Sequence, residues 1–105
     1  MGEKAVIIEE LKKFKDRINK VVFIDKFIFF GSRASGKPSK DSDIDIILVS
    51  KNFKGKKFRY RAMDLYDYWN LDYPVDFLCY SPEEFNKLKK QITIVKEAVK
   101  KGIEI

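Results

Sequence analysis

Residues 29–49, FFGSRASGKPSKDSDIDIILV, join two apolar segments through a polar loop. The short aromatic run at 26–30 ends at a Gly-Ser pair, and its composition predicts a strand. The nearly continuous Ile/Leu/Val run at 44–49 predicts a second strand that is buried on both faces. Between the two strands, Gly, Pro and Ser residues predict that 33–42 forms a loop.

Two carboxylates, Asp43 and Asp45, stand at the start of the second predicted strand. Because side chains alternate along a strand, both carboxylates project from one face. They lie too close together to stay ionised at low cost unless a cation sits between them, and hard divalent cations prefer such oxygen ligands. Gly31 and Ser32 lie just upstream, and a glycine lets backbone N–H groups approach a phosphate closely. This combination indicates phosphoryl or nucleotidyl transfer.

A P-loop is one alternative explanation of this stretch, since residues 31–37 match the pattern GxxxxGK. The next residue, Pro38, stands where a P-loop needs a Ser or Thr for magnesium, and polar residues and a strand follow instead of a helix. We therefore do not favour a P-loop. A second alternative is that the alternating acids, Asp41, Asp43 and Asp45, are solvated residues at a polar strand entrance. The Gly-Ser turn upstream, at the end of an apolar strand, favours a site instead.

The rest of the chain predicts helices packed against a small sheet. Apolar residues recur at helical spacing in two segments, Ser81 and Pro82 form the start of a third helix, and Gly102 follows its end. The predicted elements are helices at 4–20, 58–69 and 82–101, the last with a break near 91–93, and strands at 75–80 and 103–105. The fold class predicted for residues 1–105 is a single α/β (α+β) domain with a mixed sheet of three to four strands.

Basic and aromatic residues mix within 58–69, a composition that also occurs where nucleic-acid bases stack on a protein. We favour an amphipathic helix that buries Phe58, Leu65 and Trp69 in the core. Tyr60 and Tyr68 are then expected to be exposed and able to face a partner.

The composition excludes several kinds of chemistry. The 105 residues contain no histidine, which removes Ser-His and Cys-His nucleophiles, HExxH zinc sites and zinc fingers. The single cysteine, Cys79, cannot form an internal disulfide, so we expect a reducing, cytoplasmic location and a buried thiol. No apolar run is long enough for a membrane span. The net charge of +6 favours anionic partners such as nucleotides.

Residues 29–49 resemble the signature of the DNA-polymerase-β-like nucleotidyltransferase superfamily: Gly31-Ser32, a spacer, and Asp43-Ile44-Asp45 before an apolar strand. The short chain and the run GSRASGKPSKDSDIDIILV look like the minimal nucleotidyltransferases (MNT) of the MNT–HEPN toxin–antitoxin type. Members of the superfamily carry a third carboxylate on a later strand, and Asp76 stands at the expected place. The resemblance implies a polymerase-β-like palm fold for essentially the whole chain.

The resemblance also implies a catalytic site. The triphosphate of an NTP would lie on Gly31 and Ser32, with Arg33 and Lys37 adding positive charge. Asp43, Asp45 and Asp76 would be the catalytic residues and would hold two Mg²⁺ ions. The chain departs from its relatives at one position, because they often have GSRARG where Ser35 replaces the second arginine.

The expected partners follow from the same resemblance. We expect an NTP, ATP in particular, whose AMP is transferred to a hydroxyl on a partner protein, and this partner is expected to be a HEPN-type helical toxin. The main alternative is a non-catalytic antitoxin that binds its partner directly. A basic nucleic-acid-binding module is disfavoured because no motif for RNA or DNA recognition appears, and neither a membrane nor nucleic acid is an expected partner. A homo-oligomer remains open.

Overall fold

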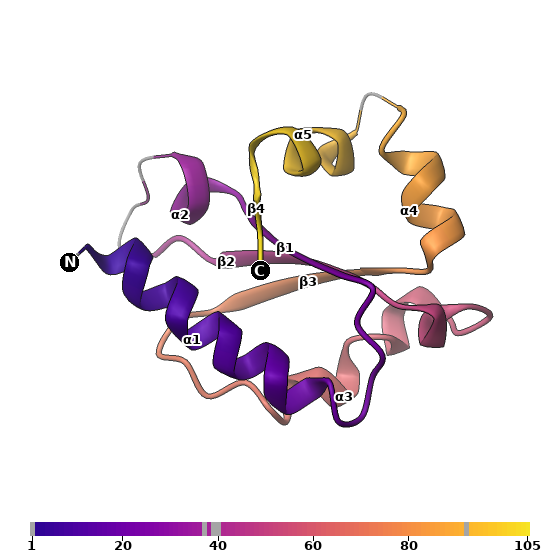
Figure 1. Cartoon of the computed structure of the whole chain (residues 1–105), viewed down its shortest axis with the longest axis horizontal. Coiled ribbons are helices and arrows are strands. Elements are labelled where there is room, and N and C mark those ends of the chain that lie inside the picture. The colour runs from indigo at the N-terminus through magenta and orange to yellow at the C-terminus, as the bar shows by residue number, and fades with distance from the viewer. Residues whose placement is uncertain (1, 37, 39–40, 92) are drawn as a thin grey trace.

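The structure, a computed structural model, describes residues 2–36, 38, 41–91 and 93–105. Within these ranges, four strands form one sheet in the order β3-β2-β1-β4 (Figure 1). The strands are β1 (Lys26–Phe30), β2 (Ile44–Val49), β3 (Val75–Tyr80) and β4 (Ile103–Glu104). Strand β1 is antiparallel to both β2 and β4, whereas β2 and β3 are parallel. The predicted α/β fold with a small mixed sheet is confirmed, and three strands have the predicted bounds.

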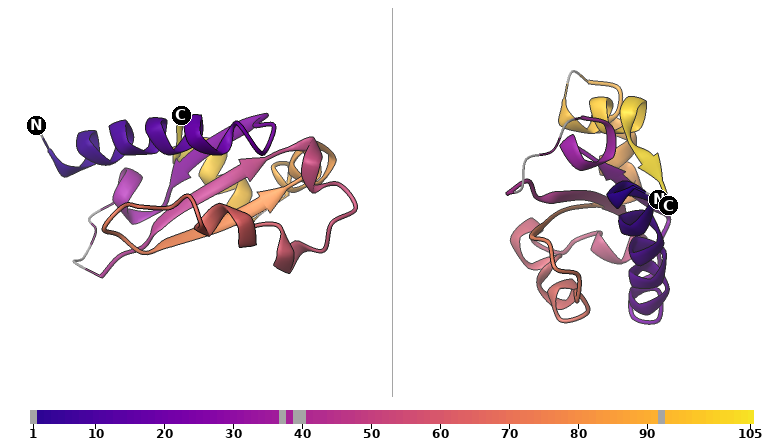
Figure 2. Two further views of the ribbon diagram at one scale, coloured as in Figure 1. Left: turned by 90° about the horizontal axis from the view of Figure 1, so that it is seen from below. Right: turned by 90° about the vertical axis from the view of Figure 1, so that its left-hand side faces the viewer.

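Helices cover both faces of this sheet (Figure 2). Helices α1 and α3 lie on one face and α4 and α5 on the other, while α2 follows the end of β1 and buries its Ala34 in the cluster on the α1 side. The helices are α1 (Glu3–Ile18), α2 (Ser32–Ser35), α3 (Met63–Tyr66), α4 (Pro82–Leu88) and α5 (Ile94–Lys101), with short 3₁₀ helices η1 (Lys51–Phe53) and η2 (Phe58–Tyr60) between β2 and α3.

The central strand β2 supplies both halves of the core. Ile44, Ile46 and Leu48 are fully buried on the side of α1. Ile47 and Val49 point to the opposite face, where they pack with residues of α4 and α5. A strand that is apolar at nearly every position therefore lies in the middle of the sheet, as its sequence predicts.

The side of α1 is closed by the predicted helical stripe and by aromatic rings. The four apolar residues of the stripe are fully or almost fully buried: Ile7, Leu11, Phe14 and Ile18. The Phe14 ring contacts the rings of Phe27, Trp69 and Phe77, with centroid separations of 5.1 to 6.2 Å. These contacts join α1 to the sheet and to the segment after α3, which fixes the first strand relative to the third.

Two predicted segments differ from the structure. The stretch 33–42, predicted as a loop, begins inside the one-turn helix α2. The predicted helix 58–69 is replaced by η2, the short helix α3 and turns. Phe58, predicted to be buried, is 50% exposed, and Tyr68, predicted to be exposed, is half-buried against the core. Tyr60 is exposed and Leu65 is buried, as predicted.

The buried side chain of Arg61 explains why the helix is interrupted. Its Nε donates to the Lys56 carbonyl (2.9 Å), and its Nη1 donates to the Cys79 carbonyl (3.0 Å). The same guanidinium pairs with the Glu84 carboxylate. These contacts hold the chain against β3 and α4, so a solvated helical face does not form there.

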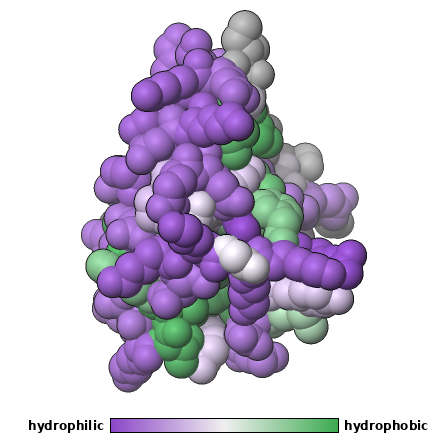
Figure 3. Space-filling view, turned by 90° about the vertical axis from the view of Figure 1, so that its right-hand side faces the viewer, coloured by the Kyte–Doolittle hydropathy of each residue, from purple (hydrophilic) through white to green (hydrophobic). Residues whose placement is uncertain are grey.

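The C-terminal part agrees with the prediction. Ser81 caps α4 through a reciprocal capping box with Glu84, and α4 and α5 are separate helices around the predicted break. Thr93 and Gly102 flank α5, while Ile92 lies outside the described residues. Among the helices that the structure describes, none has the length and apolar character needed to cross a bilayer. The side near η2 and α4 shows mostly hydrophilic side chains with small hydrophobic patches (Figure 3).

Candidate active site

Three carboxylates lie at one end of the sheet. Strands β2 and β3 are parallel, so their first residues lie at the same end of the sheet. Asp45 is the direct register partner of Asp76. Asp45 alternates with Ile47 and Asp76 alternates with Leu78, so both acids share the face covered by α4 and α5. Asp43 precedes β2 by one residue. Asp43 and Asp76 are exposed, whereas Asp45 is half-buried.

It is unfavourable for all three carboxyl groups at this end of the sheet to be ionised at once. Partial burial, together with the nearby negative charges of Asp76 and Asp43, raises the pKa of Asp45 from 3.8 to about 6. A cation placed among the three carboxylates would reverse this effect, because it favours their ionised forms. A positive charge beside Asp45 would therefore be favoured, because it lowers the cost of ionising this half-buried carboxyl group.

Gly31 lies against the central carboxylate. It follows Phe30, whose register partner is Asp45, and it has a φ of +86°. A Cβ atom at this position would overlap the Asp45 Oδ2 atom. Only glycine meets both conditions, since it has no Cβ and adopts positive φ without strain. The predicted turn residue and the predicted carboxylate are thus brought into direct contact.

The other residues predicted to bind phosphate lie in different surroundings. Ser32 is exposed as the first residue of α2. Arg33 is buried, and its Nε donates to the Ser42 carbonyl (2.7 Å) while its Nη1 pairs with Glu3 (2.6 Å). The Arg33 guanidinium also lies over the Tyr73 ring, 4.7 Å from its centroid.

Arg33 therefore connects four segments, namely α1, α2, the chain just before β2 and the chain just before β3. These contacts hold the loop that carries Gly31 close to the strands that carry the carboxylates. The predicted positive charge at Lys37 lies outside the described residues.

A cavity of about 250 Å³ adjoins Gly31 and Asp45. It lies between β1, α2 and α5, on the same face as the carboxylates. Its walls are formed by Phe30, Gly31, Ser35, Asp45, Ile94, Glu97, Ala98 and Lys101. The residues from α5 could not be assigned to the site from the sequence, because no spacing pattern links them to Gly31 or Asp45.

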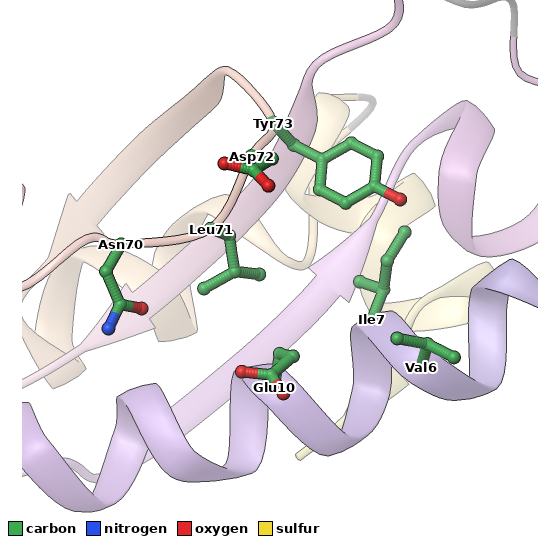
Figure 4. A pocket seen from close by; sticks show the side chains of 7 residues that line it. All are labelled: Val6, Ile7, Glu10, Asn70, Leu71, Asp72 and Tyr73. Atoms are coloured by element: carbon green, nitrogen blue, oxygen red, sulfur yellow. The ribbon is translucent and has the colours of Figure 1, made fainter.

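A larger cavity, about 410 Å³, lies away from the carboxylates. It opens between α1 and the segment 70–73, where Ile7, Leu71 and Tyr73 face one another (Figure 4). This cavity is on the side of the sheet that α1 covers, and Gly31, Asp43, Asp45 and Asp76 do not line it. The smaller cavity is therefore the one positioned for chemistry at the acids.

The carboxylates suit a hard cation by their chemistry, since they offer only oxygen ligands and excess negative charge. In residues 2–36, 38, 41–91 and 93–105, no three His, Cys, Asp or Glu side chains stand close enough together to form a ready metal site. The three carboxylates supply oxygen donor atoms, and holding one ion with all of them would require the side chains to move closer together. The side chains of Asp43 and Asp76 are exposed.

Comparison with known protein families identifies the family to which this chain belongs. The family described as "Nucleotidyltransferase domain" matches residues 7–101, a range that includes Gly31 and all three carboxylates. The chain belongs to the nucleotidyltransferase domain family. The prediction of a nucleotidyltransferase is thereby confirmed, whereas the MNT–HEPN type remains a prediction.

Two known proteins are similar to this chain. A protein of Methanocaldococcus jannaschii, named "Putative protein adenylyltransferase", is 28% identical over 101 residues, which cover 94% of this chain and 98% of that protein. The crystal structure of a protein of Sulfolobus solfataricus, titled a "putative nucleotidyltransferase", superposes with a TM-score of 0.66. It is 20% identical, and the match covers 99% of this chain and 87% of the other, so this second likeness supports the nucleotidyltransferase fold.

Proposed function

We propose that this nucleotidyltransferase moves a nucleoside monophosphate, AMP from ATP, to a hydroxyl group on a partner protein. The observation that carries the proposal is the placement of Asp45 directly beside Asp76 and in contact with Gly31. The name of the similar protein from Methanocaldococcus jannaschii, a protein adenylyltransferase, favours a protein as the acceptor.

Each part of the site has a role in this proposal. Gly31 and Ser32 approach the phosphates with backbone N–H groups and a hydroxyl, and Lys37 adds a positive charge. Arg33 acts indirectly by holding the loop through Ser42 and Glu3. Asp43, Asp45 and Asp76 would hold two Mg²⁺ ions, which when bound lower the pKa of the acceptor hydroxyl and stabilise charge on the leaving pyrophosphate.

The transfer forms one bond and breaks another. The acceptor oxygen bonds to the α-phosphorus, and the bond from that phosphorus to the oxygen bridging to the β-phosphate breaks. Pyrophosphate leaves with the electron pair, and the proton of the hydroxyl passes to solvent. Asp76 is exposed on the edge strand β3, so a protein hydroxyl can reach it from outside.

For the acceptor we propose a HEPN-type helical toxin, with this chain as its antitoxin. The support is the resemblance of residues 29–49 to the minimal nucleotidyltransferases of that pairing. Reaction in the cytoplasm with ATP as donor belongs to the same proposal.

A second candidate function is an antitoxin that acts by contact alone. It would need no metal ion, and in the described ranges no three of the acids stand close enough together to form a ready metal site. The two functions differ in whether the carboxylates are needed.

Calorimetry with ATP, with and without Mg²⁺, tests the proposed site. We expect magnesium-dependent binding by the wild type and loss of that dependence in the double variant Asp43→Asn/Asp45→Asn. Asp41→Asn, a nearby exposed acid, is the matched control and should bind as the wild type does. Equal binding by the wild type and the double variant would remove the shared-metal site from the proposal.

A further inference from the structure

The cavity beside Gly31 and Asp45 carries a positive charge that comes from the far end of the chain. Lys101, the last residue of α5, lines this cavity together with Ser35 of α2. We propose that Lys101 binds the phosphate chain of the nucleotide. The inference rests on the proposed function, since it assigns a further residue to the same substrate site.

The charges at the site explain why such a cation is needed. Even with the two Mg²⁺ ions of the proposed function, three carboxylates and a triphosphate leave an excess of negative charge that a further positive group would offset. Arg33 is 5% exposed at its side chain and is paired with Glu3, so its charge is already committed. Among the described residues that line the cavity, Lys101 is the only cation.

The end of α5 is held firmly against the sheet, which fixes the position of Lys101. The backbone N–H of Gly102 donates to the Ala98 carbonyl (2.7 Å). A Cβ atom at Gly102 would lie 2.7 Å from Ile28 Cγ2 and 3.1 Å from the Phe29 carbonyl oxygen, so helix and strand are in close contact. Ala98 is 2% exposed beneath the cavity. Lys101 therefore projects from a packed helix end rather than from a loose terminus.

Glu97 holds the lysine in the absence of a ligand. The Lys101 Nζ atom lies 3.4 Å from Glu97 Oε2, and the two side chains are 64% and 61% exposed. An exposed pair four residues apart on a helix contributes little free energy, so a phosphate competes with Glu97 for the ammonium group at small cost. A triphosphate carries more negative charge than one carboxylate and makes the stronger pair.

Calorimetry with ATP and with inorganic tripolyphosphate, both in magnesium buffer, tests the assignment. Lys101→Ala should weaken binding of both ligands by about tenfold or more, as expected for the loss of one charge-assisted hydrogen bond. Lys100→Ala is the matched control, because Lys100 is exposed on the same helix, does not line the cavity, and removes the same charge. Glu97→Gln should tighten binding, since it frees Lys101.

A rescue variant separates a charge in the cavity from a general charge effect. Ser35 faces the same cavity from α2, so Ser35→Arg combined with Lys101→Ala should restore most of the lost affinity. Three outcomes would contradict the assignment. If the wild type binds ATP, and if Lys101→Ala and Lys100→Ala bind it equally tightly, then Lys101 has no role but the proposed function stands. If Lys101→Ala weakens ATP but leaves tripolyphosphate unchanged, the phosphate assignment is overturned in favour of a nucleoside contact. If the wild type binds neither ligand, the proposed function fails and this inference fails with it.

Discussion

Gly31 lies so close to Asp45 that no larger residue fits at this position without displacing the carboxylate. Gly31 has positive φ, and a Cβ there would overlap a carboxylate oxygen of Asp45. Gly31→Ala should therefore lower the free energy of unfolding and also displace Asp45, which weakens ATP binding. The two effects are measured by denaturant unfolding and by calorimetry on the same sample.

Gly55 offers a matched control for this substitution. Its φ is +77°, but nothing lies within 4 Å of where its Cβ would be. Gly55→Ala should cost about 1–2 kcal/mol through backbone strain alone and leave ATP binding unchanged. Equal losses of stability in the two variants, with normal ATP binding by Gly31→Ala, would show that the contact with Asp45 is unimportant.

The raised pKa of Asp45, about 6, makes the stability of the metal-free protein depend on pH. Between the ordinary value of 3.8 and about 6, the folded state holds more protons than the unfolded state, so the free energy of unfolding falls as pH rises. Asp45→Asn removes this loss. We expect the variant to gain stability relative to the wild type from about pH 4 to about pH 7 in buffer with a chelator.

Thermal or urea unfolding at several pH values measures that difference. Asp41→Asn, an exposed acid in the same segment, should show no such trend between the same pH values. A constant difference between Asp45→Asn and the wild type at all pH values would contradict the electrostatic explanation of this edge.

Individual site residues were foreseeable to different degrees. The proximity of Asp45 and Asp76 follows from two strands that begin with acids and pair in parallel. The burial of Arg33 does not follow from its sequence neighbours, because its partners Glu3 and Tyr73 come from distant segments. Lys101 is hidden for the same reason, since only the packing of α5 brings it to Gly31.

At the scale of elements, strands were easier to predict than the helical region between β2 and β3. The continuous apolar run at 44–49 made β2 predictable, because a strand in the middle of a sheet is apolar on both faces. The spacing of Phe58, Leu65 and Trp69 matched a helix, yet Arg61 turns inward to three partners and breaks it. Such tertiary contacts override local periodicity, because the spacing of apolar residues does not show which distant residues a buried charge will contact.

Glu84, at the start of α4, pairs with Arg61, which also binds the Cys79 carbonyl of β3. The contribution of this pair to stability can be tested. The hydrogen bond from Arg61, with further help from the Ser81 backbone, lowers the pKa of Glu84 from 4.5 to about 2. A lowered pKa gives stability that is present above 4.5 and is lost as pH falls toward 2. Glu84→Gln keeps the capping geometry but removes the charge opposite Arg61.

We expect Glu84→Gln to cost about 1–3 kcal/mol at neutral pH, because it weakens a charged hydrogen bond to a buried guanidinium. The cost should shrink as pH approaches 2, where the wild type also loses the charge. Glu83→Gln is the control, since its pair with Lys54 is exposed and should matter little. Urea unfolding across this pH range provides the measurement, and a cost that stays constant down to low pH would argue against the ion pair.

In the whole molecule, the candidate site and the larger part of the hydrophobic core lie on opposite faces of one sheet. The face under α1 packs aromatic rings and has a cavity away from the acids, whereas the cavity on the face under α5 adjoins Gly31 and Asp45. Asp76 stands on the edge strand β3 and is exposed, so an acceptor on another protein can approach it. This arrangement suits transfer to a partner.

The difference between an enzyme and a contact-only antitoxin can therefore be tested at Asp76. A metal ligand beside the attacking hydroxyl is essential for transfer, but one exposed carboxylate is a small part of any protein interface. With ATP labelled in its α-phosphate and a HEPN-type partner, we expect label to move to a partner hydroxyl, a tyrosine in particular, and little to this chain. Asp76→Asn should abolish transfer and leave the complex intact, as judged by gel filtration.

Asp67→Asn is the matched control, because it removes one exposed carboxylate at the end of α3 and should transfer label as the wild type does. The neutralisation of toxin activity supplies the second measurement. If Asp76→Asn neutralises the toxin as well as the wild type and no label moves with either protein, the carboxylates have no catalytic role. Since the fold and the family would be unaffected by that outcome, it would identify a nucleotidyltransferase domain that acts by contact alone.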